Sequence, residues 1–252
     1  MIRFLKQVII ALIFFSVLGS IIYFTFFKKT EEPLPTPQVS ARSLEVLSSQ
    51  LLKIKNFDYD FIAEIKNPNL DLGAAGVVYE LKLFDKDSLL INVRNGSMSF
   101  LPGQIRYEII SPIITEKEIS RTEFKIINVY WEKLRDFIPR GLFLIKNQEY
   151  LPLSLEQDFS RLRATVFNNS NFDFDRVDVS VILFDENDKA IAVNKTDIRT
   201  FIKGTDRFFE VKWPDKFEGK VDRIEVNAYT YIFSNNNFIR EYGTQEKFQE
   251  FY

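Results

Sequence analysis

The feature that most constrains the fold of this chain is an internal duplication. The segment AEIKNPNLDLGAAGVVYELKLFD (63–85) is similar to ATVFNNSNFDFDRVDVSVILFD (164–185), since each has an alternating stretch, an Asn-rich turn, a second stretch and then Leu-Phe-Asp. Further along, SFLPGQIRYEI (99–109) is similar to TFIKGTDRFFEV (200–211). The offset is about 100 residues throughout, which is too long for a solenoid of short repeats and indicates two tandem domains.

Within each copy, apolar residues alternate with polar ones. Val177, Val179 and Val181 alternate with Asp178 and Ser180. The same period of two recurs at Ile105, Tyr107 and Ile109, at Leu162, Ala164 and Val166, and at Ile224, Val226 and Ala228. Strands with one buried and one wetted face are typical of antiparallel sheets.

These strands, joined by tight polar turns at 84–88 and 184–189, predict two tandem immunoglobulin- or fibronectin-like antiparallel β-sandwiches. We expect a mainly β fold, with the first sandwich at 43–135 and the second, including a connector and a C-terminal tail, at 136–252. The leucine-containing stretch 43–53 is compatible with a short helix or an edge strand. Because the connector (136–157) carries much apolar surface, docked sandwiches are favoured over freely jointed ones.

The N-terminus contains an uncharged apolar run from Val8 to Phe27. About 20 apolar residues suffice to cross the hydrocarbon core of a bilayer as a single helix. The run is longer than the apolar region of about 7–15 residues in a cleaved signal peptide, and no cleavage site of small residues follows it. We therefore expect residues 1–29 to form a single-pass transmembrane anchor with a short cytoplasmic tail.

The flanks of this run carry equal numbers of basic side chains, namely Arg3 and Lys6 before it and Lys28 and Lys29 after it. Since the N-terminal tail is very short, we expect it to stay in the cytoplasm and the bulk of the chain to be extracytoplasmic. Alternate prolines then predict an extended stalk at 30–42, whose TEEPLPTPQ segment would span about 28 Å.

The composition excludes several classes of function. With 33 Lys and Arg against 35 Asp and Glu, the chain lacks the basic surplus of a nucleic-acid-binding protein. The absence of Cys excludes disulfides and thiolate chemistry, and the absence of His removes the commonest general base and metal ligand. What remains is a folded, aromatic-rich chain with few catalytic groups.

The carboxylates gather in the two hairpin turns, at Asp85, Asp87, Asp185, Glu186 and Asp188. Turns favour Asp because its side chain bonds to nearby backbone N–H groups. A calcium loop would need six to eight oxygen ligands, and the glutamate and glycine of such a loop are missing. We therefore expect no catalytic residue, no metal ligand and no cofactor. Asn95, Asn168 and Asn194 match the glycosylation sequon, of which one or two matches are expected by chance in a chain this rich in Asn, Ser and Thr.

The aromatic residues offer the only candidate interaction surface: Trp131, Trp213, Tyr229, Tyr231, Phe233 and Phe238. Large aromatics with polar tips are favoured at protein interfaces, and they also fill sandwich cores. The sequence leaves both roles open, as core or interdomain packing and as an exposed binding strip.

Asn67-Pro68-Asn69 after an alternating strand, followed by Leu-Phe-Asp and a later Pro-Gly, resembles the LEA14/WHy domain. The second copy, with Asn168-Asn-Ser170 and Val181-Ile-Leu183-Phe-Asp185, is similar to the bacterial FxLYD domain, with Phe184 in place of the tyrosine. The resemblance covers most of 57–113 and 160–213. It implies an immunoglobulin-like fold in a membrane-attached or exported protein without enzymatic activity, and it carries over no catalytic residues.

Together these features predict a membrane-anchored, non-catalytic envelope protein whose sandwiches serve structural or protein-interaction roles. The partner would be an envelope protein that contacts sheet edges or aromatic loops. One rival is an apolar-ligand- or lipid-binding sandwich, which needs a cavity of about 300 Å³ or more between its sheets. A second rival is a carboxylate-only hydrolase of wall polymers, which needs two acids facing across a cleft.

Overall fold

The computed structural model describes residues 16–19, 41–134, 141–154 and 158–234. The chain divides into two units after Ser40, and the described residues from Ala41 onward belong to one compact unit. The predicted membrane helix and the stalk up to residue 40 lie outside the described residues, except for 16–19, which are helical. Among the described residues, no helix has the length and apolar character needed to cross a membrane.

The described part of the chain is mainly β, as the alternation predicts. Twelve strands form four three-stranded sheets in which all neighbouring strands are antiparallel. The strands are β1 (Glu45–Lys55), β2 (Asp58–Lys66), β3 (Leu72–Phe84), β4 (Leu90–Phe100), β5 (Ile105–Ile114), β6 (Arg121–Lys133), β7 (Phe143–Leu151), β8 (Ser160–Asn168), β9 (Phe174–Phe184), β10 (Ala190–Phe201), β11 (Asp206–Trp213) and β12 (Arg223–Tyr229), followed by the 3₁₀ turn η2 (Ile232–Ser234).

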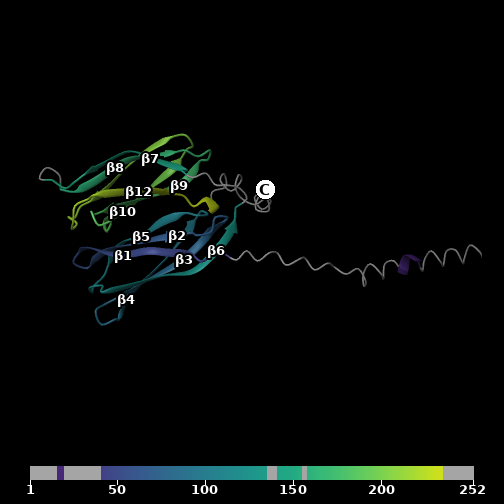
Figure 1. Ribbon diagram of the computed structural model, residues 1–252, viewed down its shortest axis with the longest axis horizontal. Coiled ribbons are helices and arrows are strands. Elements are labelled where there is room, and N and C mark those ends of the chain that lie inside the picture. Colours follow the sequence, from purple (N-terminus) through teal and green to yellow (C-terminus); the bar gives the residue numbers. More distant parts are fainter. Residues whose placement is uncertain (1–15, 20–40, 135–140, 155–157, 235–252) are drawn as a thin grey trace, which may run out of the picture. The chain divides into compact units, whose positions relative to one another are not determined.

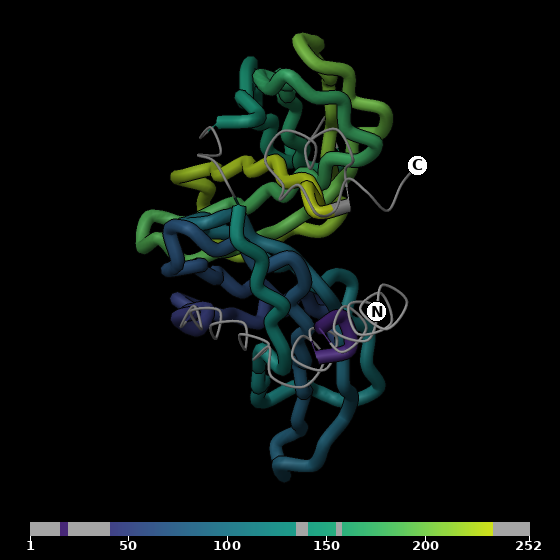
Figure 2. Tube along the Cα trace, turned by 90° about the vertical axis from the view of Figure 1, so that its right-hand side faces the viewer, coloured from purple at the N-terminus to yellow at the C-terminus, as the bar shows by residue number. Residues whose placement is uncertain are grey.

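The four sheets stack as layers (Figure 1). Sheets β4-β3-β6 and β1-β2-β5 enclose one core, and sheets β10-β9-β12 and β11-β8-β7 enclose another. The strand orders correspond, since β7 to β12 repeat the pairing of β1 to β6. Figure 2 shows the strands of the first half, in blue to teal, gathered on one side and those of the second half, in green to yellow, on the other.

The structure decides the form of two segments. The sequence leaves the first of them open and assigns the second to a connector. Of the two alternatives for 43–53, the edge strand is observed, because β2 is the one described strand that pairs with β1. The stretch 136–157, expected as a connector, contains β7, which pairs with β8 as an edge strand of the second sandwich.

The period-two pattern places the second core where the alternation predicts it. Along β8, Leu162, Ala164 and Val166 are fully buried, and along β9 so are Val177 and Val179. The pattern is different at β5, where Tyr107 and Ile109 pack toward the second sandwich instead of into the first core. The reason is that the outer face of sheet β1-β2-β5 is itself covered by a sheet.

The Leu-Phe-Asp motif has the same three roles in both halves. Leu83 and Leu183 are fully buried in the two cores. The Phe84 ring lies under the Arg121 guanidinium at 4.0 Å from the ring centroid, and the Phe184 ring lies under Arg223 at 3.8 Å. The motif therefore anchors a core position, a cation–π contact and, through its aspartate, the following turn.

A buried asparagine lies at the end of each sandwich opposite the Leu-Phe-Asp motif. Asn67 and Asn168 are both fully buried. The Asn168 Nδ2 donates to the carbonyl oxygens of Phe172 and Phe201 at 2.8 and 3.1 Å, while its Oδ1 accepts from the backbone N–H and the hydroxyl of Ser170. All four of its side-chain hydrogen-bonding positions are thus used, which binds the β8–β9 turn to the end of β10.

Asn67 makes the equivalent bonds in the first sandwich. Its Nδ2 donates to the carbonyl oxygens of Leu72 and Leu101 at 2.7 and 3.0 Å, and its Oδ1 accepts from the N–H and the side-chain amide of Asn69. The Asn-rich turns of the duplicated sequence are therefore structural connections between strands. Full burial of Asn168 also leaves no room for a glycan at that sequon.

We expect Asn168→Ala to lower the free energy of unfolding by about 3 kcal/mol, because two buried carbonyl groups lose their donor. Urea unfolding followed by circular dichroism measures the change. The matched control is Asn187→Ala in the β9–β10 turn, where the side chain is exposed, and it should change stability by less than about 0.5 kcal/mol. Equal effects of the two substitutions would contradict the assigned role of Asn168.

Candidate functional site

The two sandwiches meet through an apolar contact between the outer faces of sheets β1-β2-β5 and β10-β9-β12. The buried residues of this contact are Leu52, Ile62, Ile109, Ile182, Phe184, Ala190 and Val193, with Ile54 and Tyr107 packed against them. The central strands β2 and β9 are therefore buried on both faces, and Tyr59–Ala63 and Val179–Phe184 read as unbroken buried runs. Strands buried on both faces lose the alternation of half-exposed ones.

The corresponding outer faces that do not meet another sheet carry charged residues at the same positions. Where Ile62 lies in the first copy, Arg163 lies in the second, and its Nε donates to Glu210 at 2.6 Å. Where Ile182 lies in the second copy, Lys82 lies in the first, 3.0 Å from Glu80. At these two pairs of positions, the apolar residue thus lies on the face that meets the other sandwich and the charged residue lies on the outer face.

Polar bonds surround the apolar contact. The Tyr107 hydroxyl donates to Glu225 at 3.2 Å, and the Gln50 side chain donates to the Ala190 carbonyl oxygen at 2.8 Å. The Lys195 ammonium donates to the Ile109 carbonyl oxygen at 3.2 Å. These bonds fix the register of one sandwich against the other, since each has its donor and acceptor on different sandwiches.

Two acids on sheet β1-β2-β5 are held in partly desolvated surroundings. Burial raises the pKa of Asp60, which lies on the face of β2 that meets the second sandwich, with Ser111 and Lys195 close to it. Burial also raises the pKa of Glu108, which accepts a hydrogen bond from the Tyr79 hydroxyl at 2.8 Å. The sequence alternation points to neither residue, because both stand among ordinary strand residues.

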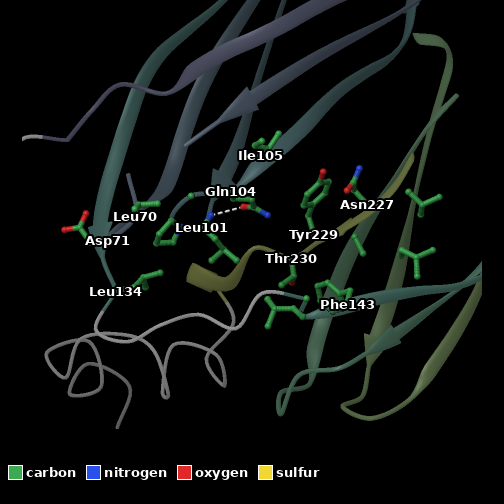
Figure 3. Close-up of a pocket in the computed structure, with 17 residues that line it drawn as sticks. Leu70, Asp71, Leu101, Gln104, Ile105, Leu134, Phe143, Asn227, Tyr229 and Thr230 are labelled. Carbon is green, nitrogen blue, oxygen red and sulfur yellow. Dashed lines mark hydrogen bonds between the residues drawn. The ribbon is translucent and has the colours of Figure 1, made fainter. Parts of the chain in front are cut away.

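A pocket of about 600 Å³ opens at one end of the junction between the sandwiches (Figure 3). Its walls are mainly apolar side chains that continue into the second core: Leu101, Leu134, Leu142, Phe143, Ile145, Val226 and Ala228. Polar groups at its edge include Gln104, Asn227 and Thr230, and Asp71 is the only charged residue among the described lining residues. The volume is typical of ligand sites. Phe143 and Ile145 lie on β7 and Val226 and Ala228 on β12, so part of the pocket wall comes from both sheets of the second sandwich, which is where the lipid-binding hypothesis expects a cavity.

Tyr229 connects this pocket to the interface. It is buried, its hydroxyl accepts from the Tyr107 N–H at 3.4 Å, and its ring lies 4.8 Å from the Arg106 guanidinium. Burial raises the pKa of Tyr229 to about 12, so the phenol stays protonated over the physiological range. The Tyr229 side chain therefore connects the two sandwiches. Its neutral hydroxyl cannot act as a base near neutral pH.

The remaining aromatic candidates are found in different surroundings. Trp213 is buried in the second core with its Nε1 donating to the Val193 carbonyl oxygen at 2.9 Å, and Trp131 is half-buried against the first core. Phe233 packs against the second core and onto Gly73, and Tyr231 is exposed. Phe238 lies outside the described residues. The structure therefore brings Tyr229 and Phe233 to the junction of the sandwiches, with the Tyr231 ring 6.2 Å from that of Phe233, whereas Trp131 and Trp213 belong to the surroundings of the two separate cores.

The hairpin aspartates bind the backbone of their own turns. Asp85 Oδ1 accepts from the N–H groups of Asp87 and Leu89, and Asp185 Oδ1 accepts from those of Asn187 and Lys189. The bond from the Leu89 N–H is the largest of the factors that hold the pKa of Asp85 below its usual value. Among the described residues, no cluster of three or more acids has a geometry that could hold a metal ion.

No family model matches the chain, and no curated protein matches it. Among solved structures, it is similar to red sea bream transglutaminase, with 12% identity and a TM-score of 0.25 over 73% of this chain, and it spans only 30% of that enzyme. It is also similar to the calcium-binding domain CBD12 of CALX1.1, with 12% identity and a TM-score of 0.18 over 60% of this chain and 68% of that one. Similarities with identities and TM-scores this low give no information about the activity or the ligands of this chain.

Ile182→Ala should lower the free energy of unfolding by about 3 kcal/mol, because it removes a fully buried side chain from the contact between the sandwiches. The matched control is Lys82→Ala at the corresponding position of the first copy, with an expected loss below about 1 kcal/mol. Chemical denaturation of the purified chain checks both. A loss at Lys82 as large as that at Ile182 would contradict the assigned interface.

Asp60→Asn should stabilise the chain at pH 7. Burial raises the pKa of Asp60 in the folded state, so folding is penalised above that pKa, where the carboxylate is charged, and the penalty disappears as the pH falls below the unfolded value of about 3.9. Unfolding curves at pH 7 and pH 3 should therefore show a gain from the substitution only at pH 7. The exposed Asp87→Asn variant should show little change, and a loss of stability in Asp60→Asn at pH 7 would contradict this sign.

Proposed function

We propose that this chain is a membrane-anchored, non-catalytic protein that holds two docked β-sandwiches outside the cytoplasmic membrane and presents them to a protein partner of the cell envelope. In this proposal, residues 1–29 form the anchor, with the N-terminus in the cytoplasm, and residues 30–42 form the stalk. The sandwiches would be immunoglobulin- or fibronectin-like domains of the LEA14/WHy and FxLYD kinds.

The observation that carries this proposal is the contact between the sandwiches. An apolar strip bounded by hydrogen bonds joins two sheets face to face, so both sandwiches are held in one relative orientation. A preorganised pair of domains loses little conformational freedom when a partner binds to it. A preorganised pair of domains of this kind is suited to the role of a scaffold or an adaptor protein.

The positions of the acids support a non-catalytic role. Asp85 and Asp185 bind the backbone of their own hairpins, and Glu210 lies within 3.1 Å of the charged groups of Arg163 and Lys212. The acids whose pKa values are raised by burial, Asp60 and Glu108, are not among the described residues that line the pocket. A hydrolase of the kind considered above needs such an acid in its cleft.

The open edge of β6 is the surface best suited to a partner strand. Among the described residues, this 13-residue strand pairs with β3 alone, and its side chains Ile127 and Tyr130 are largely exposed. Strand addition uses unpaired N–H and C=O groups at such an edge, with alternate side chains giving specificity. By contrast, the edge strand β5 contains Pro112, which cannot donate a backbone hydrogen bond.

A photo-crosslinking residue in place of Ile127 should capture one reproducible envelope protein in native membranes, identified by mass spectrometry. The same residue in place of Phe208, which is exposed on sheet β11-β8-β7, serves as the matched control and should capture that protein much less. Capture of lipid or glycan only, at both positions, would contradict the proposed function.

The topology can be tested independently by protease protection. External protease should cut the chain after Lys29 in intact spheroplasts. Protection in spheroplasts, with cleavage only after lysis, would reverse the proposed orientation and leave the docked sandwiches unaffected.

A further inference from the structure

The last strand of each sandwich faces its core with side chains of different size. In the first sandwich, Phe124 and Ile126 of β6 pack against the core. In the second, Val226 and Ala228 of β12 take the corresponding positions. The correspondence follows from the strand registers, since β6 pairs with β3 and β12 with β9 at equal distances from the shared Leu-Phe-Asp motif. The second sandwich therefore has less apolar side-chain volume at these two positions.

Phe124 fills space between the two sheets of the first sandwich. Its ring stacks on that of Phe61 in β2, with 5.6 Å between the ring centroids, and its centroid lies 5.2 Å from that of Tyr79 in β3. In the second copy, aliphatic side chains replace all three rings, in chain order Leu162, Val179 and Val226. An aromatic cluster that closes the first sandwich is thus missing from the second.

The junction pocket lies where the second sandwich lacks this volume. Val226 and Ala228 line the pocket from β12, and Phe143 and Ile145 line it from β7, which belongs to the facing sheet. The large Phe143 side chain does not fill the space, because its ring packs inward, with its centroid 5.3 Å from that of the buried Phe174. The pocket therefore extends between the two sheets at the open side of the sandwich.

The first sandwich supplies the other side of the pocket. Figure 3 shows Leu101 and Gln104 of the β4–β5 turn on this side and Phe143 on the side of the second sandwich. The Gln104 side chain already has a partner, since its Oε1 accepts from the Leu101 N–H at 2.8 Å. Asn227 likewise donates to Glu225 at 3.0 Å. These two amides are thus engaged at the edge of a pocket whose deeper walls are apolar.

The walls indicate a hydrocarbon chain as the ligand. Between β7 and β12, the pocket occupies the place of apolar side chains, so its occupant must be narrow and apolar there. A polypeptide segment in the same place would set backbone N–H and C=O groups against aliphatic side chains, which costs free energy unless each group finds a partner. The volume of about 600 Å³ accommodates one hydrocarbon chain and is small for the two chains of a membrane lipid.

We propose that the junction pocket binds the acyl chain of a single-chain amphiphile such as a fatty acid. The chain lies between β7 and β12, and its polar head remains in solvent at the rim. Charges of both signs are found at this rim, since Asp71 lines it and the Arg42 guanidinium bonds to the nearby Pro68 carbonyl oxygen. The site therefore selects the chain and not the charge of the head. This binding depends neither on the membrane anchor nor on the envelope partner proposed above.

Site mapping with a photoreactive fatty acid tests this proposal. The full-length chain in phosphatidylcholine nanodiscs is irradiated with a fatty acid that carries a diazirine at the end of its chain, and mass spectrometry locates the labelled residues. We expect label at 141–145 on the β7 side and at 226–230 on the β12 side. The corresponding strands of the first sandwich, β1 and β6, are the internal control and should carry at least about tenfold less label.

A filled pocket should exclude the chain. Val226→Phe combined with Ala228→Ile restores the side chains of the first copy and should reduce the label on β7 to the level of the control strands. Circular dichroism checks that this variant folds. Ile105→Asp is a second variant at a lining residue that is 47% exposed, so it leaves the cores unchanged, and it should lower the label at least about threefold. Its matched control is Ile202→Asp, at a 45% exposed position in the β10–β11 turn, which should label as the unmodified chain does.

Three results would overturn the proposal. The first is label on β1 and β6 as strong as that on β7 and β12. The second is undiminished label in the filled variant. The third is the absence of label from β7 and β12, which is also expected if a segment of the chain itself occupies the pocket. A phosphatidylcholine carrying the same diazirine chain should label the pocket much less, and equal label from this two-chain lipid would contradict the single-chain assignment.

Discussion

The apolar contact between sheets β1-β2-β5 and β10-β9-β12 is the interaction on which the rest of this structure depends. In the part of the chain that the structure describes, each sheet of each sandwich has three strands, so each core is small. The contact covers the outer face of one sheet of each sandwich. It therefore buries Ile62 and Ile182 in addition to the residues that are buried in the two cores. Burial of apolar surface is the main stabilising term for a domain, and here a third apolar layer adds to the two cores.

The two copies have kept their connections and changed their surfaces. The buried asparagines, the hairpin aspartates and the arginine over phenylalanine recur at matching positions in both halves. The outward side chains differ, with Ile62 opposed to Arg163 and Leu89 opposed to Lys189. Residues that hold strands together are constrained by the fold, whereas outward residues can be adapted to a neighbour. The differences between the copies are therefore the most direct indication of where contacts are made.

The sequence predicts the strands and turns better than the surfaces between them. The alternation at Leu162, Ala164 and Val166 correctly predicts a half-buried strand, and turn chemistry accounts for Asp85 and Asp185. Tyr107 and Ile109 alternate equally well, yet they face the second sandwich, because period two identifies an apolar face without naming what covers it. The full burial of Asn67 and the raised pKa of Asp60 depend on residues distant in sequence and could not be foreseen from local pattern. Of the candidate aromatics, no local signal separates Trp213 in a core from Tyr229 at the junction.

The most direct measurement of this docking is the distance between spin labels on the two sandwiches. The chain has no cysteine, so labels can be placed at Lys125→Cys on β6 and Lys212→Cys on β11, both of which are exposed strand positions on the outermost sheets. Docked sandwiches predict one narrow distance distribution by pulsed electron–electron double resonance, which broadens when Ile62 and Ile182 are both replaced by aspartate. A broad distribution in the unmodified chain would show that the sandwiches move independently and would contradict the docked arrangement.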